Sequence, residues 1–493
     1  MLNLNQRNNT RSSSCRRRRR HRSSPLVALF WMLGVATTHV WIHRTHSSSL
    51  RILNTSRHRQ QQVISSRLSL TRLFAVDSKN QTHTETQHRS SNSMASTTIN
   101  TDTANGVASI GAKRVTVEYD MEAAGARLRA GDLVAFPTET VYGLGCHALD
   151  PAAIQKVFAA KERPASDPLI SHVLDKQQAF SLWKAGSTPG SEAHHILSTL
   201  CDAFWPGPLT LVAVAAEHVP DSLMAGTGYC AVRSPSHAVS RALIQAAAVP
   251  IAAPSANKFG HVSPTTADHV WDDLHKEDVW ILQHADEQLS NGASFSGKSS
   301  CNVGVESTVA KLEMDASDVT TGTLTVLRQG AVSVAELHLS LQTAGFDGIQ
   351  VAAVHRATGD HVAHVAPGQT IRHYSPNTPS FLVSKTCLQG DLTDAEKHLL
   401  QSCIVIDFGQ RLAAWKDLCR EYRDLSVTAD SAQACAAVFE TLRWTEHVSD
   451  CTHVLFPELP VQSEDALAMA LKDRLTRAAS GMVWDRLRTG TDA

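Results

Sequence analysis

The sequence lacks an excess of charge of either sign. Its 493 residues include 46 Lys and Arg against 47 Asp and Glu, which gives a formal net charge of −1. Proteins that bind nucleic acid usually combine a basic surface with aromatic side chains that stack on bases, whereas aromatic residues make up only 5% of this chain. The 42% of hydrophobic residues is ordinary for a globular protein, and the length indicates two or three domains. The composition therefore favours a small-molecule substrate over nucleic acid.

Paired cysteines are also missing. The ten cysteines are scattered, with no Cys-x-x-Cys pair and no Cys/His spacing typical of a zinc site. We expect reduced thiols in a protein that is not secreted, and no residues that form a metal site of their own.

Regular periodicity is absent from residues 1–107, which we interpret as a targeting leader followed by a disordered linker. An arginine run at 16–20 precedes a short apolar run at 26–42 and a stretch rich in Ser, Arg, Thr and Gln. This order is typical of a leader for import into a plastid or a mitochondrion. A retained membrane anchor is the alternative, although the apolar run is short for a spanning helix. A second start at Met94 would give a cytoplasmic form.

From residue 108 onward the pattern is regular α/β, because short β-branched runs alternate with amphipathic helical stretches. The clearest helix has Asp150 as its N-cap and Pro151 as its first residue. The first domain is expected at 108–347. Its predicted strands lie at 114–118, 133–136, 169–173, 209–214, 230–233, 251–253, 279–283, 308–312 and 324–328.

A second, smaller α/β domain is expected at 378–493, after a linker at 348–377. Its predicted strands lie at 381–383, 403–406 and 453–456, and its helices near 395–401, 431–442 and 464–480. No Gly-x-Gly-x-x-Gly motif occurs in it, so we expect no dinucleotide site there. Its role stays open at this point.

The motif PTETVYGLG at 137–145 follows a predicted strand, and ligands in open α/β sheets usually bind beyond strand ends. It offers the hydroxyls of Thr138 and Thr140 before two glycines. A plain turn with left-handed glycines is the alternative.

Two cations lie just past the clear helix. Lys161 and Arg163, two residues apart in a segment predicted to be extended and stiffened by Pro164 and Pro168, can point to the same side. A rigid pair of this kind suits a triphosphate, although a solvated helix end is the simpler interpretation.

Further polar groups follow other strands. Ser255 and Asn257 lie in PSAN at 254–257, where an Asx or Ser turn is the alternative. Ser263, in SPTT, is predicted to begin a helix whose backbone amides could receive a phosphate. Arg233 and Arg328 end two predicted strands, and GVESTV at 304–309 opens another.

Taken together, TETVYGLG, Lys161-x-Arg163 and PSAN closely resemble the YrdC-domain family, the threonylcarbamoyl-AMP synthases. The resemblance covers about 114–347 and, through the second domain, most of the rest. It implies a YrdC-like twisted mixed sheet with helices, followed by a smaller Rossmann-like α/β domain. It also implies that L-threonine, bicarbonate and ATP, with Mg²⁺, give threonylcarbamoyl-AMP, which passes to a tRNA threonylcarbamoyl transferase complex.

The resemblance implies roles for individual residues. Lys161 and Arg163 are the expected catalytic residues. Lid residues are expected in the linker at His373 and Tyr374. The nucleotide-binding residues implied are Lys161, Arg163, Asp167, Tyr229, Ala253, Ser255, Asn257, Ser263, Arg328 and Tyr374. The threonine-binding residues implied are Thr138, Thr140, His172, Arg233 and Ser307.

Three departures from the family pattern stand out: a long Ser-, Asn- and Gly-rich stretch at 284–302, Asp167 where Asn is usual, and Asp473 where Asn is expected. Two other functions remain open from the sequence. One is an RNA-binding or ribosome-associated module. The other is carbamoyl transfer, although the zinc-finger cysteines and acylphosphatase domain of relatives with that activity are not visible.

Overall fold

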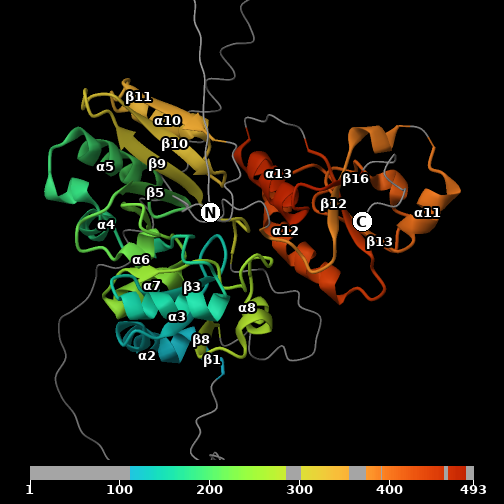
Figure 1. Cartoon of the computed structure of the whole chain (residues 1–493), viewed down its shortest axis with the longest axis horizontal. Coiled ribbons are helices and arrows are strands. Elements are labelled where there is room, and N and C mark those ends of the chain that lie inside the picture. The colour runs from blue at the N-terminus through green and yellow to red at the C-terminus, as the bar shows by residue number, and fades with distance from the viewer. Residues whose placement is uncertain (1–110, 285–300, 355–372, 390, 460–464, 485–493) are drawn as a thin grey trace, which may run out of the picture. The chain divides into compact units, whose positions relative to one another are not determined.

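The first domain of the computed structural model is built on a mixed sheet of eleven strands (Figure 1). The structure describes residues 111–284, 301–354, 373–389, 391–459 and 465–484. The expected leader, the second start at Met94, most of the stretch at 284–302 and most of the linker lie outside these residues.

The eleven strands combine parallel and antiparallel neighbours. For example, the second strand of the chain runs parallel to one neighbour and antiparallel to the other. In sheet order the strands are β1 (Lys113–Thr116), β8 (Val279–Gln283), β2 (Leu133–Phe136), β3 (Gly143–His147), β7 (Ile251–Ala252), β4 (Ile170–His172), β6 (Tyr229–Arg233), β5 (Leu209–Val214), β9 (Thr308–Met314), β10 (Gly322–Arg328) and β11 (Ile349–Ala353).

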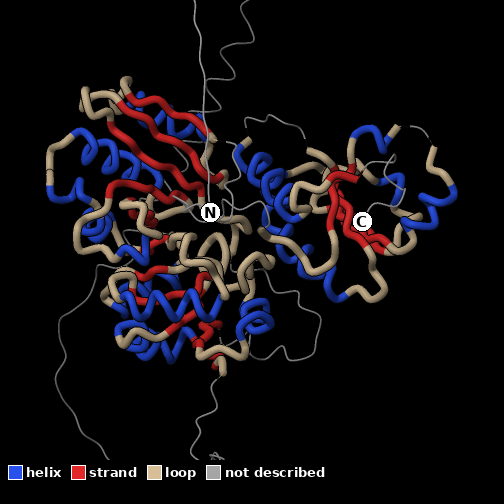
Figure 2. The backbone as a smooth tube through the Cα atoms, in the orientation of Figure 1, coloured by secondary structure: helices blue, strands red, loops and turns tan. Residues whose placement is uncertain are grey.

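Helices pack against this sheet (Figure 2). They are α2 (Val117–Arg129), α3 (Pro151–Lys161), α4 (Lys176–Leu182), η1 (Lys184–Ser187), α5 (Glu192–Phe204), α6 (Asp221–Met224), α7 (Ala238–Ala247), α8 (Ala267–Leu274) and α10 (Val334–Thr343). The helices α2 and α7 pack closely, because a Cβ added at Gly125 would lie 2.6 Å from the carbonyl carbon of Ala246.

Helix α3 begins where the sequence predicted, but the chain beyond its end differs from the prediction. The Asp150 side chain accepts a hydrogen bond of 2.9 Å from the amide of Ala152, and Pro151 is the first helical residue. Lys161 is the last helical residue, and Glu162 adopts a left-handed conformation with φ of 55°. The prediction of an extended Lys161–Arg163 segment was therefore wrong, because a left-handed C-cap turns the chain.

The glycines of the PTETVYGLG motif belong to a strand that the sequence did not predict. Gly143 and Gly145 lie in β3, which pairs antiparallel with β2. A Cβ at Gly145 would approach Phe136 and Ile251 to 2.8 Å. These glycines therefore permit close packing rather than a left-handed turn.

The C-terminal domain has a parallel sheet of five strands, as expected for a Rossmann-like α/β domain. Its strands in sheet order are β14 (Glu421–Asp424), β13 (Cys403–Asp407), β15 (His453–Pro457), β12 (Ser380–Val383) and β16 (Val483–Trp484). Its helices are η2 (Lys385–Leu388), α11 (Asp394–Leu400), η3 (Ala413–Trp415), α12 (Ser431–Trp444), η4 (Thr445–His447) and α13 (Ala466–Ala478). In the first domain, β11 begins just after Asp347 and pairs with β10.

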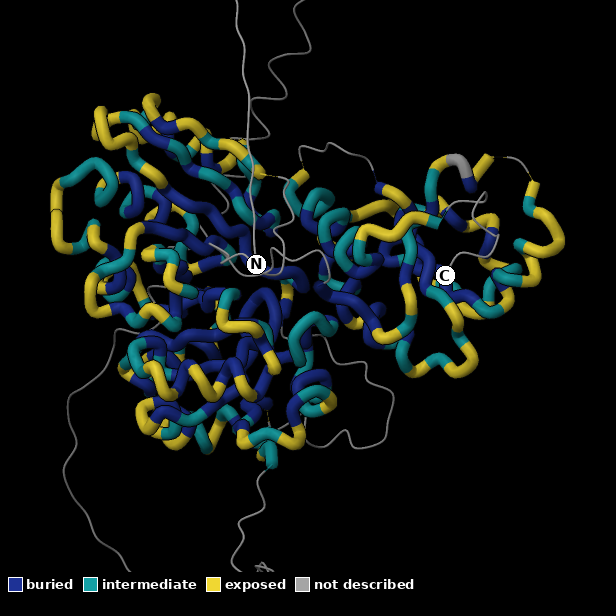
Figure 3. Tube along the Cα trace, in the orientation of Figure 1, coloured by how far each residue is buried: buried dark blue, intermediate teal, exposed yellow. Residues whose placement is uncertain are grey.

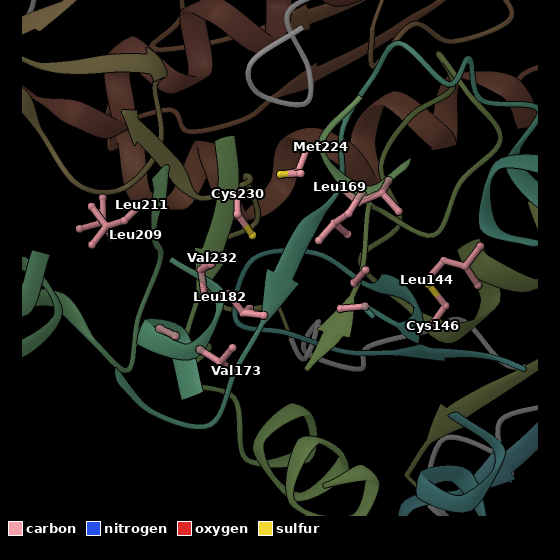
Figure 4. Close-up of a cluster of buried hydrophobic side chains, with 14 of the residues drawn as sticks. Leu144, Cys146, Leu169, Val173, Leu182, Leu209, Leu211, Met224, Cys230 and Val232 are labelled. Carbon is pink, nitrogen blue, oxygen red and sulfur yellow. The ribbon is translucent and has the colours of Figure 1, made fainter. Parts of the chain in front are cut away.

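Buried apolar side chains fix both sheets in place, and the buried residues are the dark blue parts of the tube in Figure 3. Leu144, Leu169, Leu209 and Val232, from four different strands or strand ends, belong to one fully or almost fully buried cluster (Figure 4). Truncating a buried Leu to Ala typically costs about 2–5 kcal/mol of unfolding free energy. This core holds the strand ends at fixed positions.

Membrane helices and disulfides are both missing from the described residues. None of their helices combines the length and the apolar character that crossing a bilayer requires. The nine cysteines among them, from Cys146 to Cys451, are free thiols.

Candidate active site

A cavity of about 490 Å³, which includes space open to solvent, lies where the ends of several strands of the first domain meet. Three arginines from separate elements face it, together with hydroxyl groups and one carboxylate. Its lining residues are Thr138, Thr140, Val141, Gly143, Arg163, Ile170, His172, Arg233, Ala253, Pro254, Ser255, Glu306, Ser307, Arg328 and His373.

One wall joins the hydroxyls that follow β2 to the arginine that ends β6. The Oγ1 atoms of Thr138 and Thr140 lie 2.8 Å apart, and Arg233 donates to Thr140 Oγ1 at 2.9 Å. Arg233 also forms an ion pair of 2.6 Å with Glu139. Burial alone would raise the pKa of Glu139, but the charge of Arg233 and the hydrogen bonds to the carboxylate outweigh it and lower that pKa. The guanidinium is therefore fixed in direction before any ligand binds.

His172 ends β4 on the same cavity, and its ring is neutral. Its Nδ1 lies 3.2 Å from the carbonyl oxygen of Ile170, which favours the tautomer that carries the proton on Nδ1. Burial, followed by the charge of Arg233, lowers the pKa of His172 to about 3. A neutral imidazole can contact a cationic or hydroxyl group without repelling it.

A second wall is formed by Arg328 at the end of β10. Its Nε and Nη2 donate to the backbone oxygen and to the Oγ of Ser307, both at 3.0 Å. The hydroxyl of Ser307 also lies 2.7 Å from that of Thr210. Among the described residues, no carboxylate forms an ion pair with Arg328. Its charge is therefore open to an anionic ligand.

Arg163 is fixed by the residue that departs from the family pattern. It forms an ion pair of 2.9 Å with Asp167, and both side chains are almost fully buried. It also donates to the backbone oxygens of Asp167 and Pro168. Asp167 was predicted to contact the nucleotide, but it does not line the cavity. It orients Arg163 instead.

Lys161 and Asn257 lie behind the cavity rather than on its lining. Because α3 ends at Lys161, the Nζ atom reaches the loop after β7 and donates to the backbone oxygens of Ser255, at 2.6 Å, and Asn257. The Asn257 amide donates to the backbone oxygens of Lys258 and His261. Burial and the nearby Arg163 charge lower the pKa of Lys161 well below its usual range. Lys161 thus supports the loop that presents Ser255.

Ser263 and the predicted helix start also differ from expectation. The helix α8 begins only at Ala267, and its N-cap Thr266 accepts from the amide of His269. This is ordinary capping rather than an anion site. Ser263 instead donates to Glu306 at 2.6 Å, so it contacts the cavity only through that carboxylate.

The two predicted lid residues have different positions. His373 lines the cavity, and its ring lies 4.0 Å from that of Tyr374. Tyr374, with φ of 62°, is fully buried against Phe439 of α12 and does not line the cavity. Burial and the nearby positive charges, Arg163 first among them, lower the pKa of His373 well below its usual range.

Tyr229 lies away from the cavity. It begins β6, whose last residue, Arg233, is the one that reaches the cavity. A strand rises about 3.3 Å per residue, so the two lie roughly 13 Å apart. The amine of Lys311 lies 3.8 Å from the centre of the Tyr229 ring. Tyr229 therefore does not line this cavity.

Two acidic residues at the cavity were not predicted as site residues. Glu306 lines it, and Glu139 orients Arg233. Both are almost fully buried, with 5% and 6% of their surface exposed. The signal in the sequence was an acid inside an apolar and hydroxyl-rich run, in TET and in VEST, where an unpaired buried charge would be costly.

Two family models together match most of the described chain. The Sua5/YciO/YrdC model, described as telomere recombination, matches residues 126–330. The model described as the C-terminal domain of threonylcarbamoyl-AMP synthase matches residues 332–480.

Relatives of known name support the same grouping. The chain is 36% identical over 266 residues to the threonylcarbamoyl-AMP synthase of Pyrococcus abyssi, covering 54% of this chain and 68% of that protein. It is 30% identical over 375 residues to that of Bacillus subtilis, covering 73% and 93%. A solved structure of P. abyssi Sua5 complexed with L-threonine matches with a TM-score of 0.58 at 29% identity, covering 76% of this chain and 98% of that one. The chain therefore belongs to the threonylcarbamoyl-AMP synthase family, in a form that joins a Sua5/YrdC-type domain to the family's C-terminal domain.

Proposed function

We propose that the chain makes threonylcarbamoyl-AMP in this cavity from L-threonine, bicarbonate and ATP, and releases diphosphate. Family membership and the names of the relatives support the reaction. The observation that carries the assignment to this cavity is the convergence of Arg163, Arg233 and Arg328 from three separate elements. The reaction joins an amino acid carboxylate, a carbamate and a triphosphate, so its site must gather positive charge.

The wall formed by Thr138, Thr140 and Arg233 is the proposed threonine site. Arg233 is already oriented by Glu139, so it offers its guanidinium to the amino acid carboxylate at little further entropic cost. The neutral ring of His172 lies on the same cavity and does not repel the amine. Ser307, held by Arg328, lies toward the nucleotide side. The Pyrococcus protein, solved with L-threonine, supports a threonine site in the family.

The nucleotide is proposed to bind along Arg163, Ser255 and Arg328. The amine of threonine first adds to CO₂ derived from bicarbonate and gives a carbamate. A carbamate oxygen then attacks the α-phosphorus of ATP. A new P–O bond forms while the bond from that phosphorus to the bridging oxygen breaks, and the electron pair leaves on diphosphate. Fixed guanidinium groups stabilise the charge that develops, so positioning and electrostatics provide most of the rate enhancement.

Mg²⁺ is proposed to enter with ATP as part of the substrate. Glu306, which lines the cavity, is paired with Arg474, and the acids behind the lining are paired with its arginines: Asp167 with Arg163 and Glu139 with Arg233. None of them is free to form a protein cage for the ion. Mg²⁺ often relies on substrate phosphates for its ligands, which fits this arrangement.

The release of diphosphate from ATP tests the reaction. Purified protein is incubated with ATP and Mg²⁺, with threonine and bicarbonate both present, each omitted, or both omitted. Release that requires both co-substrates supports the proposal. Release that is indifferent to threonine contradicts it.

We also propose a destination for the protein and for its product. The arginine run and the apolar run at 26–42 support import into an organelle, with a cytoplasmic form starting at Met94. A fluorescent protein fused after residue 107, with and without residues 1–93, tests this by microscopy. The same distribution for both fusions would contradict it. We also propose that the adenylate passes to a tRNA threonylcarbamoyl transferase complex.

A further inference from the structure

The C-terminal domain inserts a charged side chain beside the cavity. Arg474, on α13, has no exposed surface. Its Nε donates at 3.0 Å to the carboxylate of Glu306, a residue that lines the cavity. Its Nη1 donates to the backbone oxygen of Gln329 and to Asp473, both at 2.9 Å. Moving a guanidinium out of water is costly unless it is paired in this way.

The contacts of Glu306 account for both of its oxygens. Ser263 donates to Oε1 at 2.6 Å, and Arg474 donates to Oε2 at 3.0 Å. The Tyr374 ring lies 5.2 Å from the Arg474 guanidinium carbon and completes the enclosure. Both oxygens of the carboxylate therefore accept hydrogen bonds from side chains other than the cavity arginines.

This arrangement distinguishes Arg328 from the other cavity arginines. Arg163 and Arg233 each have a carboxylate of their own, Asp167 and Glu139. Among the described residues, Arg328 forms hydrogen bonds only with Ser307. Glu306 is near enough to Arg328 for its charge to act on it. Glu306 and Arg328 both line the cavity, and Arg328 donates to Ser307, the residue that follows Glu306 in the chain.

We propose that Arg474 is a positioning residue of the adenylate-forming site, which engages Glu306 so that Arg328 stays open to an anionic ligand. The ligand class is the phosphate groups of the nucleotide. This inference rests on the proposed function for its ligand, and it gives the C-terminal domain a role in the chemistry of the first domain. The domain contributes a charge that completes the cavity, through a contact between residues far apart in the sequence.

Charge substitutions in the full-length chain test this role. In Arg474→Met the Glu306 carboxylate loses its partner and turns to Arg328. We expect the Kd for a non-hydrolysable ATP analogue, measured by calorimetry, to rise roughly tenfold or more. The Kd for L-threonine should change much less, because Arg233 and its partners are untouched. Lys472→Met, which removes a cation from the same helix without a side-chain contact to the cavity, should leave both affinities unchanged.

A second substitution separates this role from a purely structural one. Adding Glu306→Gln to Arg474→Met removes the carboxylate charge, so nucleotide affinity should recover most of the loss. Arg474→Lys keeps the charge and should stay within about threefold of the wild type. Thermal unfolding is recorded for every variant. If Arg474→Met does not fold, the double variant and the lysine variant still decide: both should bind the analogue with near wild-type affinity.

An Arg474→Met protein that folds and binds the analogue like the wild type overturns the inference. A double variant that binds the analogue no better than Arg474→Met also overturns it. If Arg474→Met does not fold, a double variant that binds the analogue much more weakly than the wild type overturns it. If the wild type binds the analogue but forms no adenylate, the proposed function fails. The comparison of nucleotide affinities can still succeed in that case, so the two failures are distinguishable.

Discussion

Both domains place acidic residues near strand ends, but among the described residues these acids have different partners. In the C-terminal domain, Asp407 ends β13 with no exposed surface and accepts from the amides of Phe408 and Leu412 and from the hydroxyl of Tyr422, all at 2.7 Å. Each oxygen is used inside the domain. In the first domain, the acids hold arginines whose guanidinium groups face a cavity.

The difference shows what a strand end needs to become a binding site. Ligands favour the carboxyl ends of parallel strands, yet the oxygens of Asp407 and Asp424 accept hydrogen bonds from backbone amides and the Tyr422 hydroxyl inside the domain. In the first domain the hydrogen-bond capacity that remains is on cations and hydroxyls. A position at the end of a strand is therefore not enough to make a binding site. The first domain is distinguished by cations and hydroxyl groups that can still donate hydrogen bonds to a ligand.

Arg328→Ala should have the largest effect on activity. Removing one fixed donor to developing charge typically costs about 2.7–4 kcal/mol, or roughly 10²–10³-fold in rate. We expect kcat/KM for diphosphate release to fall by that factor. Arg411→Ala, at an exposed position of the C-terminal domain, is the matched control and should retain wild-type activity. A loss below threefold in Arg328→Ala would break the comparison.

His261, which links the two domains, should make stability depend on pH. Its ring nitrogens lie 2.9 Å from Asp273 and from Glu446. Burial alone would lower its pKa, but the hydrogen bonds to Asp273 and Glu446 outweigh burial and the nearby Arg443 charge and raise it to about 9. The pKa is raised above the unfolded value of about 6.5, so the contribution is complete below pH 6.5 and is lost as pH rises through 9.

We expect the free energy of unfolding in urea to fall by about 2–3 kcal/mol between pH 6.5 and 9.5 through this group. His261→Asn should flatten that part of the pH profile. Equal slopes for the wild type and the variant would show that His261 is not held as a cation between the domains.

Asp407→Asn should have the opposite signature to Arg328→Ala. An amide keeps only one acceptor oxygen and places a donor against backbone amides, so we expect a loss of about 1–3 kcal/mol in the free energy of unfolding. Nucleotide affinity per folded molecule should not change. Asp450→Asn, whose side chain is 83% exposed, is the control for stability. A nucleotide affinity that falls with Asp407→Asn would indicate a second binding region.

Tyr229→Phe should have the smallest effect. The hydroxyl makes one long contact of 3.4 Å with Glu313, and the residue lies at the far end of β6 from the cavity. Surface substitutions of this kind usually change the free energy of unfolding by no more than about 0.5 kcal/mol, and we expect the affinity for ATP to change by no more than roughly twofold. An affinity for ATP that is tenfold weaker in Tyr229→Phe would show that Tyr229 contributes to nucleotide binding.

Much of the fold was predictable because local pattern and tertiary context agree. The strands β2, β5 and β8 have the predicted bounds, since each is a short run of β-branched or apolar residues. The strand β3 was missed because its glycines read as a turn. The strand β14 was missed because its alternating polar residues, half of them exposed, give no apolar signal.

Many residues of the predicted motifs line one cavity, but the geometry that places the others elsewhere could not be predicted. Thr138, Arg163, Ser255 and Arg328 come to one cavity, as their motifs suggested. The direction of Lys161 depends on the left-handed cap after it, which no periodicity reports. The ion pair between Arg474 and Glu306 joins residues 168 positions apart, and a single sequence carries no signal for such a pairing.

Mass spectrometry of the product formed from ¹³C-labelled bicarbonate tests the central claim most directly. The wild-type protein should form an adduct of threonine and AMP that carries the label. Arg328→Ala should lose most of this labelled product, and the Arg411→Ala control should keep it. An adduct that lacks the label, or one formed equally well without the Arg328 guanidinium, would contradict this account.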